Sequence, residues 1–160
     1  MRVAVVCLAL ALALSATLVS WRPAPAANLS ACYAEYYELT ENLRAMRSWH
    51  VRWAEFLEAN PGFVPHENIV SAGAQRYWVS IYDMRLSAVY YLAIGVRTYV
   101  PWLIDQLEAT RQIHLRMAMD LYARPDAPLN ATADGADGQM RQVANYDWRL
   151  GMVHRMLADC

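Results

Sequence analysis

Apolar side chains between Cys32 and Leu57 recur at intervals that alternate between four and three residues, and no other feature constrains the fold as strongly. Such a stripe lies along one face of an α-helix that packs lengthwise against other helices. One polar residue, His50, stands within it, so the predicted core contains a histidine. The helix is expected to end at Asn60-Pro61-Gly62, a strong stop signal. The stripe consists of Cys32, Tyr36, Leu39, Leu43, Met46, His50, Trp53 and Leu57.

Three further segments show the same helical spacing. A turn at 98–100 is expected to separate the second from the third, because Pro101 cannot continue a helix without losing a backbone hydrogen bond. One long helix kinked at Pro101 is the alternative. The stripe residues are Val70, Ala74, Tyr77, Ile81, Met84, Ala88 and Tyr91 in the second segment, Leu107, His114 and Leu121 in the third, and Val143, Tyr146, Leu150, Val153, Leu157 and Cys160 in the fourth.

The four stripes predict an all-α domain, an up-down-up-down four-helix bundle over residues 28–160. Its helices are expected at about 31–59, 67–98, 101–123 and 139–159, with a loop over 126–138, which is rich in Ala, Asp, Gly and Pro. With 160 residues the chain has room for one domain with a core of its own. No strand-like alternation and no internal repeat are evident in the sequence.

Residues 1–27 have the organisation of a cleavable signal peptide. Arg2 precedes an apolar run over 3–19, and the small residues Ala24-Pro25-Ala26-Ala27 suit a signal peptidase. A retained membrane anchor is one alternative. Lipidation of Cys32 is another, because Leu29-Ser30-Ala31-Cys32 looks like a bacterial lipobox. Each of the three places the domain outside the cytoplasm, as a secreted or periplasmic protein.

The cysteines then predict a disulfide. Cys7 leaves with the signal peptide, and the mature chain keeps Cys32 and Cys160, an even pair in an oxidising compartment. An even number of antiparallel helices brings both cysteines to the same end of the bundle. In the loop-entropy model such a bridge contributes about 4–5 kcal/mol to stability. Lipidation of Cys32 would prevent it.

Charge and motifs favour a non-enzymatic protein that does not bind nucleic acid. The net charge is −1, so no strong field attracts nucleic acid. The sequence has no CxxC, no Gly-rich phosphate loop and no GxSxG elbow. His66-Glu67 begins like a zinc-protease helix, but Val70 stands where the second histidine is required.

The aromatic composition predicts a protein partner. Ten Tyr and six Trp occur with only two Phe, and Tyr, Trp and Arg dominate protein–protein hot spots. We therefore expect a ligand, inhibitor or receptor-facing module, unless these aromatics only thicken the core. Membrane contact is expected only if the N-terminal segment is retained or Cys32 is lipidated. Asn28 and Asn130 are glycosylation sites if the source is eukaryotic or viral. The candidate partner surface consists of Trp49, Trp53, Trp78, Trp102 and Trp148.

No cofactor is expected in this interpretation, but the alternative function is binding of haem or a transition metal. His50 and His114 stand on diagonal helices of the predicted bundle. A rise of about 1.5 Å per residue gives them similar heights, with Met84 and Asp147 near the same level. Bundle interiors hold metals and haem through such side chains. Alternatively, each histidine is a core residue that is hydrogen-bonded to a Tyr or Asp.

Overall fold

The computed structural model describes residues 28–63, 71–124 and 135–160, and it is helical throughout. Its helices are α2 (Leu29–Ala59), α3 (Ala72–Ala93), α4 (Val100–Ala123) and α5 (Gly135–Asp159), with no strand in these ranges. The predicted all-α class is therefore confirmed for this part of the chain, whereas the predicted signal peptide, 1–27, lies outside it. None of these four helices has the length and apolarity that crossing a membrane requires.

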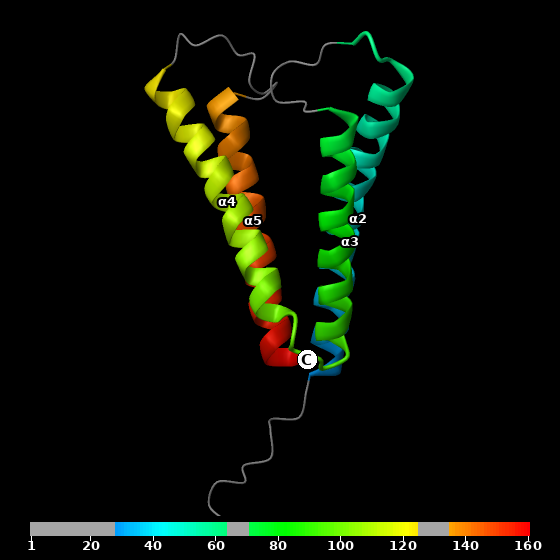
Figure 1. Cartoon of the computed structure of the whole chain (residues 1–160). Coiled ribbons are helices and arrows are strands. Elements are labelled where there is room, and N and C mark those ends of the chain that lie inside the picture. Colours follow the sequence, from blue (N-terminus) through cyan, green and yellow to red (C-terminus); the bar gives the residue numbers. More distant parts are fainter. Residues whose placement is uncertain (1–27, 64–70, 125–134) are drawn as a thin grey trace, which may run out of the picture.

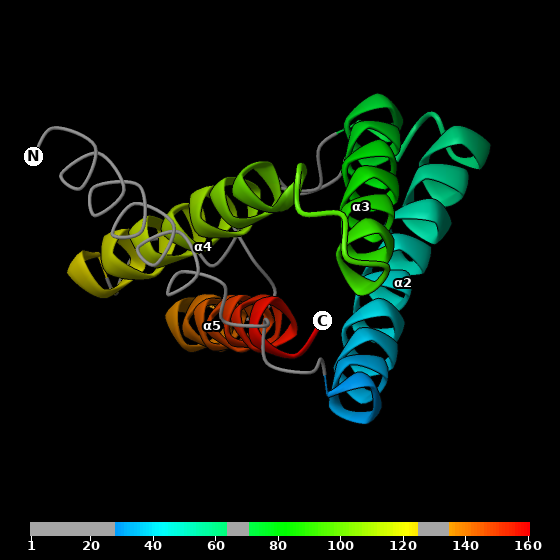
Figure 2. The ribbon, with the colours of Figure 1, turned by 90° about the horizontal axis from the view of Figure 1, so that it is seen from below.

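The helices form two antiparallel hairpins, α2–α3 (the first hairpin) and α4–α5 (the second hairpin). Most contacts between helices occur within a hairpin, and fewer join α2 to α5, α3 to α4 and α3 to α5. Figure 1 shows the hairpins close together at the end that contains Cys160 and diverging towards the other end. Figure 2, viewed from below, shows the same two pairs of helices. The arrangement is a helical bundle whose hairpins are partly independent units.

Several helix boundaries differ from those expected. α2 begins at Leu29 instead of about residue 31, and α3 begins at Ala72 instead of about residue 67. α3 ends at Ala93 instead of residue 98, because Gly95 turns the chain with a φ of 81° that other residues rarely adopt. α4 begins at Val100 with Pro101 in its first turn, so one long helix through Pro101 is wrong. α5 begins at Gly135, inside the predicted loop, and Asp137 in its first turn complements the helix dipole.

The first apolar stripe is confirmed, whereas the second is confirmed only in part, at Ile81 and Ala88. Leu39, Leu43 and Leu57 of α2 are buried. In α3, however, Tyr77 is 61% and Met84 47% exposed. The buried face lies mainly one position further along the helix, where polar side chains interrupt the apolar pattern. It consists of Gln75, Ile81, Tyr82, Arg85, Ala88, Val89 and Leu92.

The two hairpins are copies of each other, offset by 64 residues, so the expectation of no internal repeat is wrong. Residues 82–86 read Tyr-Asp-Met-Arg-Leu and residues 146–150 read Tyr-Asp-Trp-Arg-Leu. Residues 47–54 and 111–118 share Arg-x-x-His-x-Arg-x-Ala. The two copies differ at the positions between these identities, and several of those positions hold a tryptophan in only one copy. These differences obscure the repeat in the sequence.

Equivalent residues make equivalent contacts, which supports the repeat. Arg47 donates from Nε and Nη2 to the Asp83 carboxylate, at 2.5 and 3.2 Å. Arg111 donates in the same way to the Asp147 carboxylate, at 2.5 and 3.3 Å. Arg111 lies 64 positions after Arg47, and Asp147 lies 64 positions after Asp83. Each hairpin is thus closed by the same bidentate ion pair between its two helices.

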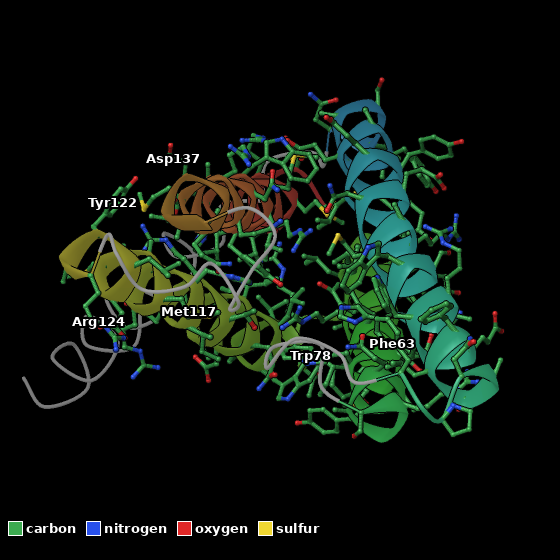
Figure 3. All side chains as sticks on the ribbon, turned by 90° about the horizontal axis from the view of Figure 1, so that it is seen from above. Phe63, Trp78, Met117, Tyr122, Arg124 and Asp137 are labelled. Carbon is green, nitrogen blue, oxygen red and sulfur yellow. A yellow bond between two sulfur atoms is a disulfide. The ribbon has the colours of Figure 1, made fainter. Side chains whose placement is uncertain are left out.

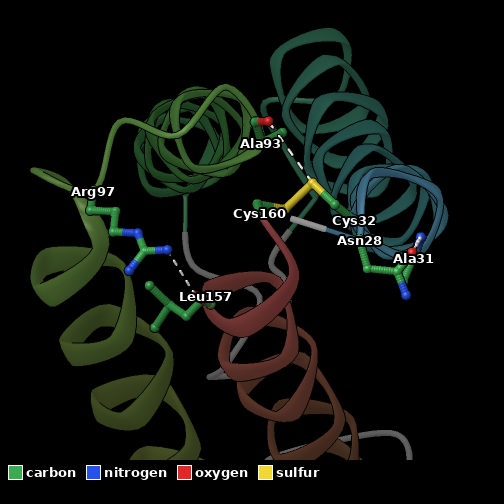
Figure 4. The surroundings of a disulfide bond; sticks show 7 residues. All are labelled: Asn28, Ala31, Cys32, Ala93, Arg97, Leu157 and Cys160. Atoms are coloured by element: carbon green, nitrogen blue, oxygen red, sulfur yellow. Dashed lines mark hydrogen bonds between the residues drawn. A yellow bond between two sulfur atoms is a disulfide. The ribbon is translucent and has the colours of Figure 1, made fainter. Parts of the chain in front are cut away.

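The predicted Cys32–Cys160 disulfide is present and joins the two hairpins. The Cα atoms of the two cysteines lie 5.2 Å apart. Figure 4 shows the bond beside the end of α3, where Cys32 Sγ lies 3.9 Å from the carbonyl oxygen of Ala93. Nearby, Arg97 from the connection between the hairpins donates to the carbonyl oxygen of Leu157, at 3.0 Å. This end of the bundle is therefore fixed by covalent and polar links between the hairpins.

Candidate functional sites

Each hairpin holds a histidine against a glutamine. His50 Nδ1 lies 2.7 Å from Gln75 Oε1, and His114 Nδ1 lies 2.7 Å from Gln139 Oε1. An amide oxygen only accepts, so each Nδ1 carries a proton and donates it. Burial lowers the pKa of both histidines below its usual value, against the opposing effect of the glutamines. Both imidazoles are therefore neutral at pH 7.

The four residues of the haem or metal hypothesis lie in separate surroundings. His50 and His114 are each bonded within their own hairpin. Met84 is exposed, and Asp147 is engaged by Arg111. Over the described ranges, no group of three or more His, Cys, Asp or Glu side chains is placed to hold a metal ion.

Between the hairpins lies a buried set of two tyrosines and two arginines, here called the interhairpin cluster: Tyr82, Arg85, Tyr146 and Arg149. The Tyr82 and Tyr146 hydroxyl oxygens are 3.2 Å apart, so one donates to the other across the two hairpins. Arg149 Cζ lies 4.5 Å from the centre of the Tyr146 ring. Arg85 Cζ lies 5.1 Å from the Tyr82 ring and 5.9 Å from the Tyr146 ring. Both guanidiniums thus lie near the Tyr146 ring.

Each arginine of the cluster also reaches into the opposite hairpin. Arg85 on α3 donates from Nη2 to Thr110 Oγ1 and to the carbonyl oxygen of Gln106 on α4, at 2.8 and 3.2 Å. Arg149 on α5 donates from Nε to Asn42 Oδ1 on α2, at 2.8 Å. Asn42 and Gln106 are themselves equivalent positions of the repeat. The cluster is a roughly two-fold symmetric joint between the hairpins.

The charges of the cluster act differently on its two tyrosines. Burial raises the pKa of Tyr82 above its usual value, and the neighbouring Tyr146 adds to this effect. Burial also acts to raise the pKa of Tyr146, but the positive charges of Arg149 and Arg85, together with hydrogen bonding to Tyr82 and Arg85, outweigh it and lower that pKa. Either hydroxyl can be the donor of the bond between the two tyrosines. The repeated Tyr-Asp-x-Arg-Leu motif was the sequence signal that could have revealed this cluster.

Aromatic side chains form a continuous row along the distal part of α2 and the turn that follows it, here called the aromatic strip: Trp49, Trp53, Phe56 and Phe63. Successive ring centres are 5.9, 5.7 and 5.1 Å apart. Trp53 is half-buried, while Trp49, Phe56 and Phe63 are 40, 42 and 44% exposed. Large apolar side chains thus face solvent together.

The five tryptophans predicted as a partner surface do not form one surface. Trp78, Trp102 and Trp148 are half-buried and pack against the core. Trp49 and Trp53 belong instead to the aromatic strip, together with two phenylalanines that the sequence analysis did not select. Figure 3 looks at the diverging end of the bundle, with Phe63 and Trp78 on the first hairpin and Met117 and Tyr122 on the second.

The aromatic strip is absent from the second hairpin. The positions 64 residues after Trp49, Trp53 and Phe56 hold Ile113, Met117 and Asp120. Ile113 and Asp120 are exposed and Met117 is half-buried, so these side chains occupy surroundings similar to their counterparts. The repeat is therefore retained in the core and lost along this face.

Of the two predicted glycosylation sites, Asn28 lies at the start of α2, where its side-chain oxygen accepts from the backbone N–H of Ala31 at 3.3 Å. Asn130 lies outside the described residues. No protein-family model, curated protein or solved structure matches this chain significantly.

Proposed function

We propose that this chain is a secreted or periplasmic, non-enzymatic interaction protein that binds a protein partner through the aromatic strip. One observation carries the proposal: the strip is exposed on the first hairpin and absent from its copy. Residues common to both copies build the hairpins and the joint between them. A face that differs between copies is free of those structural demands, so its composition is open to selection for binding.

The chemistry of the strip suits a protein surface. Rigid aromatic side chains supply large contact areas at low entropic cost and anchor interfaces in the pockets of a partner. Contiguous exposed apolar side chains on a small domain also mark interaction sites. Arg52 is exposed between Trp49 and Trp53 in the sequence, and arginine is itself enriched at interfaces. The strip would supply the apolar centre of such an interface and Arg52 part of its polar rim.

The proposed compartment rests on the sequence and on the disulfide. Residues 1–27 are proposed to be removed as a signal peptide on export. Disulfides persist in oxidising compartments, which fits the Cys32–Cys160 bridge. That bridge occupies the sulfur that lipidation of Cys32 would require. The proposed interaction protein is a ligand, an inhibitor or a receptor-facing module.

Site-specific photo-crosslinking in the native host tests the proposal. A photoreactive phenylalanine analogue replaces Phe56 in one variant and Asp120, its counterpart in the second hairpin, in the other. We expect ultraviolet light to attach one discrete extracytoplasmic protein to the variant labelled at residue 56, and none to the variant labelled at residue 120. Equal crosslinking from both positions, or none from residue 56, would contradict the proposal.

A further inference from the structure

We propose that the interhairpin cluster is a binding site for one small tetrahedral oxyanion, of the phosphate or sulfate type, held between Arg85 and Arg149. Both guanidiniums are fully buried, with exposed fractions of 0 and 1%. They come from equivalent positions of the repeat and approach the same Tyr146 ring. The site is thus composed of one cation from each hairpin.

Several donors of this site have no partner. Nε and Nη1 of Arg85 and Nη1 of Arg149 are buried and make no hydrogen bond of regular geometry with any described residue, although Arg85 also interacts with the Tyr146 hydroxyl. A guanidinium stays protonated in proteins, so these nitrogen atoms carry both hydrogen and positive charge. Buried charged donors are strongly unfavourable without an acceptor. The atoms left unpaired therefore indicate that an acceptor belongs there.

In the part of the chain that the structure describes, no carboxylate is paired with either of the two arginines. Within the described ranges, the ion pairs involve other arginines, namely Arg44, Arg47, Arg76, Arg111 and Arg155. The described partners of Arg85 and Arg149 are a hydroxyl, a carbonyl, an amide oxygen and tyrosine side chains, and none of them is a carboxylate. An oxyanion supplies charge and several acceptor oxygens at once, and arginine is well suited to bind it.

Tyr146 is the competing source of negative charge, and it also reports on the site. The charges of Arg149 and Arg85 lower the pKa of Tyr146 despite its burial. A bound anion would counteract these charges, so its binding raises the pKa of Tyr146. The alternative, an ionised Tyr146 that neutralises the cluster by itself, would produce tyrosinate absorbance without any added anion.

The anion would link the two hairpins. Arg85 belongs to the first hairpin and Arg149 to the second, and the hairpins contact each other less than their own helices do. A ligand that contacts both arginines would favour the arrangement in which the hairpins are packed together. Binding therefore couples the concentration of an oxyanion to the stability of the joint.

Titration of the full disulfide-bonded protein with inorganic phosphate, and separately with sulfate, tests the proposal. The calorimetric titrations are run at constant ionic strength in chloride after exhaustive dialysis. We expect saturable binding of one anion per chain for at least one of the two. Arg149→Met is expected to weaken binding by about tenfold or more, because it removes one of the two cations. Arg44→Met, at an exposed arginine paired with Glu41, is the matched control and should bind as the unsubstituted protein does.

A spectroscopic titration keeps the proposal testable if Arg149→Met fails to fold. The ultraviolet absorbance of tyrosinate is followed against pH for the unsubstituted protein and for Tyr146→Phe, with and without the anion. We expect the anion to shift the Tyr146 titration to higher pH. Absence of saturable binding by both anions, undiminished binding by a folded Arg149→Met, or tyrosinate at neutral pH in anion-free buffer would overturn the proposal.

Discussion

The histidines and tyrosines of the core show how residue chemistry is repeated in the two hairpins. His50 and His114 each donate to a glutamine 25 residues further along the chain. Tyr82 and Tyr146 share one hydrogen bond across the hairpins. Each of these four side chains thus has its partner at a corresponding place, which is what a buried polar group requires.

The two histidines predict a loss of stability in acid. Burial lowers the pKa of His50 and His114 from the usual 6.5, so the unfolded chain binds more protons than the folded one below about pH 6.5. The free energy of unfolding is therefore expected to fall as the pH drops from 7 to 5. Asparagine offers a similarly placed N–H without titrating. His50→Asn and His114→Asn should each flatten the dependence, and the double variant should flatten it most.

Denaturant unfolding at several pH values measures this effect. His154→Asn is the control, because His154 is exposed. A pH profile that is the same in the double variant and in the control would show that the buried histidines do not cause the acid sensitivity.

The tyrosine pair predicts non-additive stability changes. Tyr82→Phe and Tyr146→Phe each remove the same hydrogen bond and are expected to lower the free energy of unfolding by about 1 kcal/mol. Together they should cost clearly less than the sum, because the bond is lost only once. Chemical denaturation of the four proteins in the cycle gives the coupling energy. Simple additivity would mean that the two hydroxyls do not interact.

At the scale of helices, the first stripe was predictable and the second only in part. In α2 the buried positions are mostly apolar, so spacing alone placed Leu39 and Leu43 correctly. In α3 the core contains Gln75 and Arg85, so a search for apolar residues selected a neighbouring face that includes Tyr77. Burial of charged residues depends on partners from other helices, which the local sequence does not contain.

The repeat makes a matched prediction for the helices. Leu39 and Leu103 are equivalent, and both have exposed fractions of 0%. Leu39→Ala and Leu103→Ala are therefore each expected to lower the free energy of unfolding by about 2–5 kcal/mol. Tyr77→Ser, at an exposed position of the stripe that was wrongly predicted, should change it by less than ~0.5 kcal/mol. Thermal or denaturant unfolding distinguishes the outcomes. A large loss of stability in Tyr77→Ser would mean that Tyr77 is buried, as the predicted stripe required.

At the scale of the whole molecule, the disulfide and the interhairpin cluster hold two similar hairpins together. The disulfide could be predicted from two independent arguments. The cysteine count leaves Cys32 and Cys160 as a pair, and an even number of helices brings both to one end of the bundle. The candidate site could be predicted only in part. Aromatic composition selected Trp49 and Trp53, but these two lie in the aromatic strip, whereas the other three tryptophans of the predicted surface pack on the core. The interhairpin cluster depends on contacts between hairpins and became visible only with the repeat.

Removing the disulfide is expected to destabilise the joint and to leave the helices intact. The bond closes a separation of 128 residues. Cys32→Ala combined with Cys160→Ala should therefore lower the free energy of unfolding by about 4–5 kcal/mol, through the greater entropy of the unfolded chain. Denaturant unfolding followed by circular dichroism measures the loss of stability. The spectrum without denaturant shows whether the variant is still helical. An unchanged midpoint would mean that packing between the hairpins suffices without the bond.

The most direct test of the account exchanges the aromatic strip for its counterpart. Trp49→Ile, Trp53→Met and Phe56→Asp together give the first hairpin the residues that the second hairpin already holds at equivalent positions. We expect this variant to remain folded, with its disulfide intact, and to lose affinity for the partner identified by crosslinking by about a hundredfold or more, because it removes three anchor side chains. The measurement is the dissociation constant of the purified partner for the variant and for the unsubstituted protein. A folded variant that binds the partner with unchanged affinity would contradict the claim that function resides in the face where the two hairpins differ.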